Sequence, residues 1–453
     1  MNPFARDLVR IVLVNLLVKP AWILTENGVQ NAVGHESYGR YAALFSLTFI
    51  LATMLDPGLT QLATREIAAD NPQKMEIFGA IFWLKLALAF AFPWVVWAGM
   101  AALGYTNWGM GMTLAGLQIC VGVLAFFRGA MQGMQFFVAD AFFSVADKAL
   151  LFPLLFLFWA GMTAERFAAL NFFVAAGCAV AAAALLHRRV AYPLPRTKLV
   201  FDVLWQSRHF ALMVLLYNAL DRLNLVMVER RMGAEAAGLF AGAHRWFGAF
   251  SMYLWMILPI LYAKFAKSRD HRLIAKGLPF VAIPLIWVGG FCVFHGEKLL
   301  FLFTKSSAAD MAAMTESLSV LGATLMLAAV HNIFSTFLTA TGNEKSVNVL
   351  ILFAIATNIG IFLALPADVG PSAGAWGLLA SHTVLFVGYP ALVRFKSRVP
   401  LPYSVLVGLA VFVSLYVALL KMTEGGVWWI SMILSCSISG AWATIFYWKT
   451  LKK

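Results

Sequence analysis

Charged residues are scarce in this sequence. Asp, Glu, Lys and Arg make up 12% of the 453 residues, whereas a soluble domain has about 25%. Hydrophobic residues account for 62%, and the mean hydropathy is +0.81. The apolar runs are continuous and do not alternate with polar residues, which argues against a membrane β-barrel. These features predict an all-α polytopic membrane protein, long enough for about twelve to fifteen spans.

Cysteines and catalytic motifs are also few. The four cysteines each lie in an apolar segment, without a CxxC spacing or a histidine companion, so they predict neither disulfides nor a metal site. The N-terminal segment has no A-x-A site, and we expect the first span to remain as an anchor. The outer loops, of which residues 296–314 form the longest, have no HExxH motif and no catalytic triad. We therefore expect a non-enzyme without a cofactor.

The hydropathy pattern predicts fourteen spans, and the basic residues predict their orientation. The loops on the side of the N-terminus hold 21 Lys and Arg residues and the opposite loops hold 7. This bias places both termini in the cytoplasm and explains most of the net charge of +13, so we expect no nucleic-acid partner. The predicted spans are residues 8–32, 38–62, 77–102, 109–128, 138–160, 165–187, 207–231, 237–263, 276–295, 315–338, 346–366, 372–394, 402–421 and 426–448.

Weak internal repeats divide these spans into two related halves. The segment Gly34-His-Glu-Ser-Tyr-Gly-Arg-Tyr-Ala-Ala resembles Gly233-Ala-Glu-Ala-Ala-Gly-Leu-Phe-Ala-Gly, and Phe127-Arg-Gly-Ala-Met-Gln-Gly resembles Phe337-Leu-Thr-Ala-Thr-Gly-Asn-Glu. Both pairs follow the same order along the chain. The sequence predicts a six-helix lobe at 1–187, a basic cytoplasmic linker at 188–206, a second six-helix lobe at 207–396 and two further helices at 397–453. The linker's basic residues suit contact with anionic membrane lipids.

Charged residues inside the spans are the candidate functional groups. Within the apolar stretch Leu215–Gly233, Asp221 and Arg222 lie near the middle, where a charge costs roughly 2.5–3.5 kcal/mol. Adjacent residues of a helix point about 100° apart, so we expect this Asp and Arg not to pair with each other, and each to have a partner elsewhere or water. Asn218, Arg222 and Glu229 share one helical face, and Asn15, Lys19 and Glu26 repeat their types and spacing.

Other polar residues are interpreted more simply. Asp56, followed by Pro57 and Gly58, predicts the end or a kink of a helix. A stripe on the fifth span either lines a cavity or pairs helices; its members are Asp140, Ser144, Asp147 and Lys148. We interpret His331 and His382 as packed polar residues, with a proton relay as the alternative.

Three segments resemble a known family. They are Tyr38-Gly-Arg-Tyr-Ala-Ala with Leu55-Asp-Pro-Gly-Leu-Thr, then Gly238-Leu-Phe-Ala-Gly-Ala-His-Arg, and Asn358 followed by Leu365-Pro-Ala-Asp-Val-Gly-Pro-Ser-Ala-Gly-Ala-Trp-Gly. Over about residues 8–396, the chain resembles Wzx-type polysaccharide repeat-unit flippases of the multidrug/oligosaccharidyl-lipid/polysaccharide (MOP) flippase superfamily. The resemblance implies two pseudo-symmetric lobes around a V-shaped cavity in the bacterial inner membrane. It also implies alternating access for a polyprenyl-diphosphate-linked oligosaccharide, with polysaccharide polymerase machinery as a partner.

Such a substrate needs a cationic cavity, because Arg binds a diphosphate through two oxygens. The candidate substrate-binding cations are Arg222, Lys19, Arg245 and Lys85. The candidate acids for coupling to H⁺ or Na⁺, or for charge relay, are Asp221, Glu26, Asp147 and Glu229. The candidate polar residues of the cavity are Asn15, Asn218 and Asn358. The structural alternatives are an ion pair that locks the bundle for Arg222, and snorkelling to the membrane interface for Arg245 and Lys85.

Two other transport functions stay open at this point. A multidrug cation antiporter of the MATE type shares the superfamily fold, but it requires an acid-dominated cavity, and here the embedded bases at least match the acids. A flippase for the peptidoglycan lipid precursor acts on a similar polyprenyl diphosphate.

Overall fold

Long helices make up the protein. The computed structural model describes residues 21–69, 71–187, 189–194, 197–268 and 270–422, and these contain no strand. Eleven helices among them are long and apolar enough to cross a membrane. The prediction of an all-α polytopic membrane protein is confirmed. The described residues fall into two compact units, Met1–Gly238 and Leu239–Lys453.

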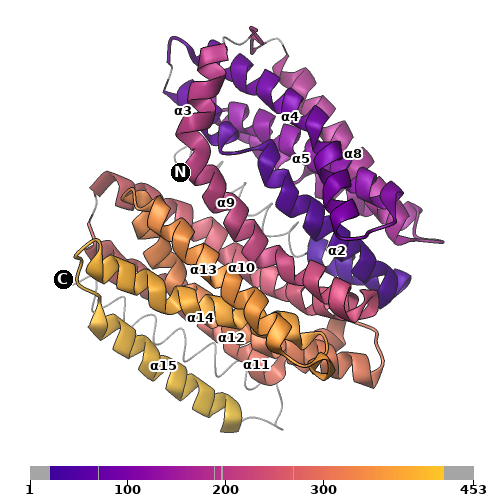
Figure 1. Cartoon of the computed structure of the whole chain (residues 1–453), viewed down its shortest axis with the longest axis vertical. Coiled ribbons are helices and arrows are strands. Elements are labelled where there is room, and N and C mark those ends of the chain that lie inside the picture. Colours follow the sequence, from indigo (N-terminus) through magenta and orange to yellow (C-terminus); the bar gives the residue numbers. More distant parts are fainter. Residues whose placement is uncertain (1–20, 70, 188, 195–196, 269, 423–453) are drawn as a thin grey trace. The chain divides into compact units, whose positions relative to one another are not determined.

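The first unit is built around α5 (Trp108–Gly133), shown with its neighbours in Figure 1. This helix contacts α2 (His35–Ala52), α3 (Leu59–Ala68), α4 (Lys74–Ala102) and α8 (Ala164–Leu186). The fifth predicted span divides into α6 (Phe137–Phe143) and α7 (Ala146–Leu157), and α7 packs on α8. The last helix of the unit, α9 (Thr197–Met232), packs against α2.

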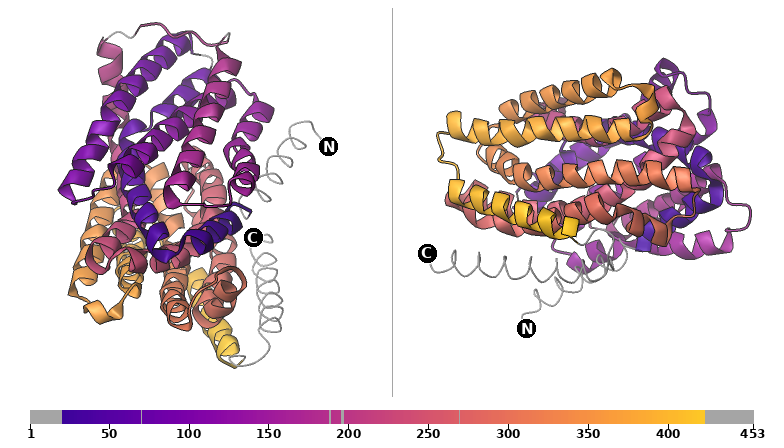
Figure 2. Two further views of the ribbon diagram at one scale, coloured as in Figure 1. Left: turned by 90° about the vertical axis from the view of Figure 1, so that its right-hand side faces the viewer. Right: turned by 90° about the horizontal axis from the view of Figure 1, so that it is seen from below.

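The second unit is a bundle whose helices run side by side in Figure 2. Its members are α10 (Ala234–Ser268, from Leu239 on), α11 (Arg272–Phe303), α12 (Ala308–Ala340), α13 (Glu344–Ala364), α14 (Ser372–Phe395) and α15 (Tyr403–Met422). The central helix is α12, which contacts α11 and α14. Gly289 of α11 and Gly322 of α12 let the two backbones meet, since a Cβ on either glycine would lie 2.5–2.6 Å from the other's carbonyl oxygen.

The predicted spans compare with the observed helices as follows. Eleven of the fourteen have a counterpart among the eleven candidate spans. The span at 138–160 is broken at Ser144 and Val145, and the span at 426–448 and the first part of 8–32 lie outside the described residues. The prediction of a long outer loop at 296–314 is wrong. Helix α11 continues past a kink at His295 to Phe303, and α12 begins at Ala308. The second half of the predicted linker is helical, since α9 begins at Thr197. The lobe boundaries stay a prediction.

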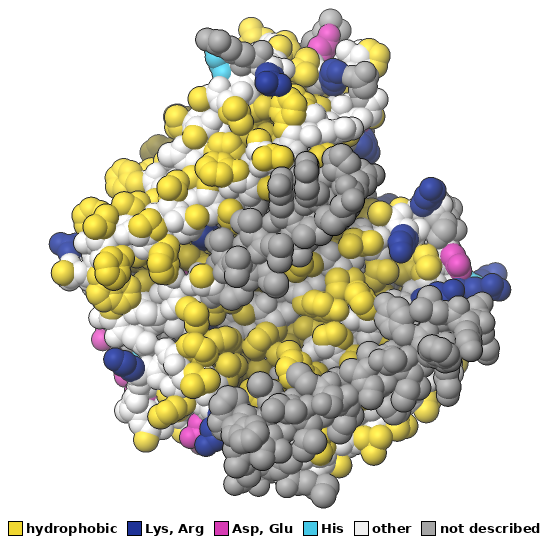
Figure 3. Space-filling model, turned by 180° about the vertical axis from the view of Figure 1, so that it is seen from behind, with side chains coloured by type: hydrophobic (Ala, Val, Ile, Leu, Met, Phe, Trp, Pro, Cys, Tyr) yellow, Lys and Arg dark blue, Asp and Glu magenta, His cyan; other side chains and the backbone are white. Residues whose placement is uncertain are grey.

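Hydrophobic side chains cover much of the surface, as Figure 3 shows for one face. Large examples are Phe90 and Phe156, with exposed fractions of 81% and 82%. Exposed apolar residues on this scale are costly in water and favourable in lipid. The fold therefore presents a large apolar surface around an interior that is itself mostly hydrophobic and contains a smaller number of buried polar residues.

The first internal repeat is visible as a close, reciprocal contact within the first unit. Gly34 and Gly233 begin corresponding helices and both have a positive φ, +81° and +93°. Five residues later, a Cβ on Gly39 would lie 1.8 Å from the Ala234 oxygen, and a Cβ on Gly238 would lie 2.0 Å from the His35 oxygen. The two segments thus contact each other through equivalent residues, as in a two-fold arrangement.

Candidate functional site

A break in a membrane-spanning helix is the centre of the polar structure in the first unit. The chain leaves α2 at Ala52, forms a single 3-10 turn, η1 (Thr53–Leu55), and resumes as α3 at Leu59. Pro57 disfavours helical geometry at the preceding Asp56, whose φ is −144°. Gly58 then takes a left-handed conformation with φ of +79°. The predicted helix end at Asp56 is confirmed.

The Asp56 side chain holds the start of α3. Its Oδ1 accepts a hydrogen bond of 3.0 Å from the Thr60 backbone N–H, and its Oδ2 accepts one from the Thr60 hydroxyl. A carboxylate at this position satisfies a free helix N–H and interacts favourably with the positive end of the helix dipole. Asp56 is therefore the residue that makes a helix break tolerable inside a membrane.

Lys85 of α4 completes this cluster. Its Nζ lies 3.0 Å from Asp56 Oδ2 and within 3.4 Å of the Leu55 carbonyl oxygen, which the break leaves free. The ammonium also lies 5.5 Å from the centre of the Phe126 ring. Only 7% of the Lys85 side chain is exposed, so the snorkelling alternative is wrong. The sequence contained the signal for this pair, an Asp-Pro-Gly turn and a lysine deep in the next span.

Asn218 of α9 contacts the same break from another side. Its Nδ2 donates a 3.0 Å hydrogen bond to Thr53 Oγ1 in η1. The break is thus fixed by Lys85 from α4 and by Asn218 from α9. Lys85 and Asn218 are thus two predicted site residues that the structure brings together, at the α2–α3 break.

One turn further along α9, Asp221 and Arg222 form an ion pair. Arg222 Nε lies 3.0 Å from Asp221 Oδ2, and the exposed fractions of the side chains are 29% and 39%. The prediction that these neighbours do not pair is wrong, because a long arginine side chain can curl back toward the preceding residue although the two Cβ atoms diverge. The guanidinium also lies 5.3 Å from the centre of the Phe49 ring on α2.

This ion pair leaves hydrogen-bonding capacity unused. The Nε–H of Arg222 is buried and makes no hydrogen bond of good geometry within the described residues, although Nε lies 3.0 Å from the carboxylate of Asp221. Asn224, two residues on, is fully buried, and neither end of its amide has a partner in the same part of the chain. Unpaired buried polar groups each cost about 1–3 kcal/mol. The sequence analysis missed Asn224, although an Asn in this apolar stretch was a signal.

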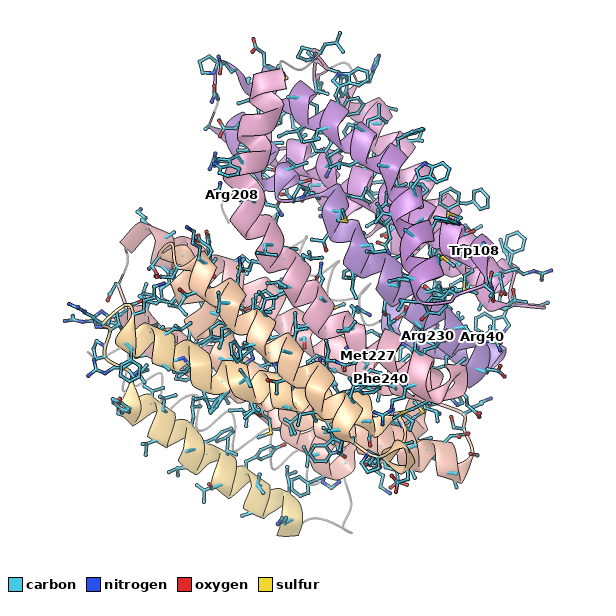
Figure 4. All side chains as sticks on the ribbon, in the orientation of Figure 1. Arg40, Trp108, Arg208, Met227, Arg230 and Phe240 are labelled. Atoms are coloured by element: carbon cyan, nitrogen blue, oxygen red, sulfur yellow. The ribbon has the colours of Figure 1, made fainter. Side chains whose placement is uncertain are left out.

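Glu229 lies near the last turn of α9, beside a different group. Its negative charge interacts with the phenol of Tyr105, which lies in the connection between α4 and α5. Arg230 lies 5.2 Å from the centre of the same ring. Burial, followed by the negative charge of Glu229, raises the pKa of Tyr105 above its ordinary range. Figure 4 shows Arg230 and Arg208 toward opposite ends of α9. Glu229 thus interacts with Tyr105, whereas Arg222 pairs with Asp221.

The remaining acids of the first unit lie in two further places. Asp147 binds its neighbour Lys148 at 3.1 Å, and Lys148 lies 4.4 Å from the centre of the Trp22 ring, in the helical stretch that also contains the half-buried Glu26. Asp140 instead accepts from Arg128 of α5 at 2.8 Å. The predicted stripe on one continuous helix is wrong, because the break at residues 144–145 separates these acids.

The second unit holds the two predicted residues Arg245 and Asn358. Arg245 is buried in α10, with 9% exposed. Asn358 of α13 is completely buried, and both ends of its amide lack a hydrogen-bond partner within the residues the structure describes. Lys19 and Asn15 lie outside the described residues.

Two hollows adjoin each other on the first unit. One, of about 530 Å³, is lined by backbone and side chains that include Lys74 and Arg189. The other, of about 800 Å³, is almost entirely apolar and is lined by α6 and the end of α8, with Phe142 and Leu185 among its residues. Gln135 and Phe136 line both hollows. The described residues contain no cluster of three or more His, Cys, Asp or Glu that could hold a metal ion.

The N-terminal part of the sequence decides the family. A family model described as "Polysaccharide biosynthesis protein" matches residues 4–265, more than half of the chain. The chain belongs to this family of polysaccharide biosynthesis proteins. No curated protein sequence matches this polysaccharide biosynthesis protein closely.

Solved structures show that this polysaccharide biosynthesis protein has the fold of the MOP superfamily. The structure titled "Lipid II flippase MurJ, inward closed conformation" has a TM-score of 0.75 at 11% identity, and the match covers 98% of this chain and 100% of that chain. An inward-facing multidrug resistance MATE family transporter of the MOP superfamily has a TM-score of 0.64 at 14% identity, covering 90% and 99%. The MATE multidrug transporter DinF-BH in complex with R6G has a TM-score of 0.61 at 17% identity, covering 87% and 95%.

These likenesses confirm the fold that the predicted superfamily implies. At such low identities they establish the fold alone. Together, the family and the fold show a multi-pass membrane protein of a polysaccharide biosynthesis family. They are also consistent with the expectation that the protein is not an enzyme.

Proposed function

We propose that this protein moves a polyprenyl-diphosphate-linked oligosaccharide, a polysaccharide repeat unit, from the cytoplasmic to the outer leaflet of the bacterial inner membrane. The single observation that carries the proposal is the Asp221–Arg222 pair in the membrane-spanning part of α9. A family named for polysaccharide biosynthesis supports the substrate class. Alternating access is the mechanism that we infer from the shared fold.

Arg222 suits a diphosphate for a physical reason. Its side chain is partly exposed, and its ion-pair partner is the adjacent Asp221. A phosphate oxygen would accept a charge-assisted hydrogen bond from the guanidinium, which is about twice as strong as a neutral one. In the substrate-free state, Asp221 balances the charge and reduces the cost of keeping the arginine in hydrocarbon.

The other predicted residues take different roles in this proposal. Lys19 and Arg245 are further cations for the diphosphate, and Asn15, Asn218 and Asn358 are polar contacts of the cavity. Lys85 is fully engaged by Asp56, Thr60 and Leu55. We therefore assign Lys85 a positioning role, in which it keeps the α2–α3 break in place for the neighbouring α9.

Energy for transport comes from an ion gradient in this proposal, with H⁺ and Na⁺ as the candidate ions. Asp221, Glu26, Asp147 and Glu229 are the candidate acids of the first unit. Both termini lie in the cytoplasm, and polysaccharide polymerase machinery receives the product. The charge bias of the loops supports the orientation, and the family supports a place in polysaccharide biosynthesis.

Anionic membrane lipids are a second class of partner. The hollow with Lys74 and Arg189 adjoins the apolar hollow between α6 and α8, and Arg189 lies 4.6 Å from the centre of the Phe136 ring that borders both. A lipid phosphate suits the basic hollow and an acyl chain suits the apolar one. By the charge bias of the loops, both lie on the cytoplasmic side, where a juxtamembrane base is worth about 1 kcal/mol toward an anionic surface.

The deciding experiment measures flipping in proteoliposomes. A labelled polyprenyl-diphosphate oligosaccharide is incorporated, and its appearance in the opposite leaflet is measured for the wild type, Arg222→Ala and Arg222→Lys. Arg40→Ala is the matched control, because Arg40 lies on α2 in an exposed i, i+4 pair with Glu36. We expect Arg222→Ala to lose about 10–100-fold in rate, the loss of one charged hydrogen bond of 1.5–3 kcal/mol. An unchanged rate in Arg222→Ala would refute the assignment.

A second candidate is a flippase for the peptidoglycan lipid precursor, and the extent of the match to MurJ favours it over a cation exporter. Both substrates contain a polyprenyl diphosphate, so Arg222 would have the same role. Competition distinguishes them: excess peptidoglycan precursor should leave oligosaccharide flipping unchanged if the proposed function is right. Transport of organic cations alone would instead support the multidrug antiporter.

A further inference from the structure

A pair of histidines forms a polar contact between two helices of the second unit. His331 Nε2 of α12 lies 2.9 Å from His382 Nδ1 of α14. The exposed fraction of His331 is 0%, and its Nδ1 makes no hydrogen bond within the described residues. His382 is only half-buried. A completely buried imidazole is therefore linked to the exterior of the unit through a second, more accessible imidazole.

We propose that His331 and His382 together bind the proton that drives transport, an inference that rests on the proposed function and names its coupling ion. At a nitrogen separation of 2.9 Å, the space between the two rings holds one hydrogen atom. In the neutral pair, one ring donates and the other accepts. An added proton makes one ring an imidazolium that donates to the remaining neutral ring, and this charge-assisted bond is stronger than the neutral one.

The pair binds one proton rather than two. Two imidazolium rings at this distance would repel each other, and neither facing nitrogen would retain a lone pair to accept the hydrogen bond. The uptake is therefore a single step of one charge. Histidine is the side chain whose ordinary titration lies between about pH 5 and 8, the range of a bacterial proton gradient.

Carboxylates, the usual alternative, are missing from the middle of this unit. The acids of residues 239–422 lie in connections or in the terminal third of a helix, and α14 has none; they are Asp270, Glu297, Asp310, Glu316, Glu344 and Asp368. Glu316 accepts from Ser372 at the first residue of α14. The histidine pair is thus the ionisable group in the middle of α12 and α14 on which a proton can be bound.

The helices packed around the pair bring few ionisable groups. From α14, the Tyr389 ring lies 5.7 Å from His331, and from α10, the Phe247 ring lies 6.2 Å from His382. His244 stacks beside Phe247 at 5.7 Å, whereas Arg245, two residues before Phe247, points to the other side of α10. The ionisable residues of α11 and α13 are Arg272, Lys276, Cys292, His295, Glu297, Lys298, Glu344 and Lys345.

A charge that is added between α12 and α14 can move helices. The pair connects the central helix of the unit with a neighbour, and ring contacts extend it to α10. Protonation adds a positive charge to a buried site, which favours any arrangement that admits water or an anion to His382. Proton binding thereby biases the bundle between two packings, as coupled transport requires.

The experiment uses purified protein in liposomes loaded with the labelled lipid-linked oligosaccharide. Flipping is measured with and without a pH gradient at constant membrane potential, and separately with a sodium gradient. The variants are His331→Gln and His382→Gln, which retain an amide hydrogen bond but cannot titrate. His244→Gln is the matched control, a buried histidine of the same unit outside the pair.

We expect wild type and His244→Gln to gain up to about tenfold in rate per unit of pH gradient, the limit for one coupled proton. Both pair variants should flip at a rate that the gradient does not change. Stimulation that persists in the pair variants, or a wild type driven by sodium alone, would overturn the proton assignment while leaving the flippase function intact. A wild type without any flipping would instead refute the proposed function.

A measurement on the wild type covers the case in which the variants do not fold. Nitrogen NMR of protein with ¹⁵N-labelled histidine follows the ring nitrogens of the pair between about pH 5 and 8.5. We expect the signals of two rings to change together with an uptake of one proton. If one of the two pair variants does fold, this change should be absent from its spectrum. Rings that titrate independently, or a pair that does not titrate, would contradict the proposal.

Discussion

The reciprocal contact of Gly39 and Gly238 allows a stability prediction to be worked out in detail. A Cβ at position 238 would lie 2.0 Å from the His35 carbonyl oxygen and 2.7 Å from its carbon. Normal contacts are longer than 3 Å, so the Gly238→Ala variant must separate two backbones by about 1 Å, with an overpacking cost of 1–3 kcal/mol. Backbone atoms cannot move aside as a flexible side chain can.

The matched control is another glycine of the same helix. Gly248 belongs to the same helix, α10, but a Cβ there would meet nothing within 4 Å. Gly248→Ala should therefore gain about 0.5–1 kcal/mol from helix propensity. We expect Gly238→Ala to unfold several degrees below Gly248→Ala in a thermal assay in detergent.

A double-mutant cycle tests the reciprocity. The first alanine already separates the helices, so Gly39→Ala and Gly238→Ala together should cost less than the sum of the single changes, by about 0.5–3 kcal/mol. A Gly238→Ala variant at least as stable as Gly248→Ala would refute the close approach. Strict additivity would show that the two glycines act at separate contacts.

The remaining predictions concern charges. Lys85→Ala leaves the half-buried carboxylate of Asp56 without its cation and should cost about 1–3 kcal/mol, whereas Lys85→Ala combined with Asp56→Asn should recover part of this loss. Equal melting temperatures for the single and double variants would contradict the pair. The pKa of Tyr105 is raised in the folded protein. The contribution of this tyrosine to stability is therefore complete below the ordinary tyrosine pKa of about 10, and it falls as the pH rises above that value. Tyr105→Phe should remove this alkaline loss of stability in unfolding measurements from pH 8 to 11. The double variant Lys74→Gln with Arg189→Gln should retain less anionic phospholipid in native mass spectrometry, whereas the exposed control Arg166→Gln should retain as much as the wild type. Equal retention by the double variant and the control would contradict the lipid assignment.

Several features followed from the sequence by itself. Continuous apolar runs determine membrane helices, because every backbone group in lipid must be satisfied within its own segment. The Asp-Pro-Gly turn at residues 56–58 determined a helix break, because proline and glycine act on the local backbone. The repeat of Gly34 and Gly39 at Gly233 and Gly238 indicated two related halves, and the structure joins these segments through equivalent residues.

Partners of the charged residues were decided only by the tertiary structure. Helical spacing shows which residues share a face, but it does not show which helix that face meets or how a long side chain bends. Asp221 and Arg222 pair although their Cβ directions diverge, and Lys85 turns to Asp56, nearly thirty residues earlier in the chain. His331 and His382 were interpreted separately, and only the packing of α12 on α14 brings their rings to 2.9 Å. Pairing in a membrane depends on short-range geometry across helices, because an unpaired charge there is too costly to remain alone.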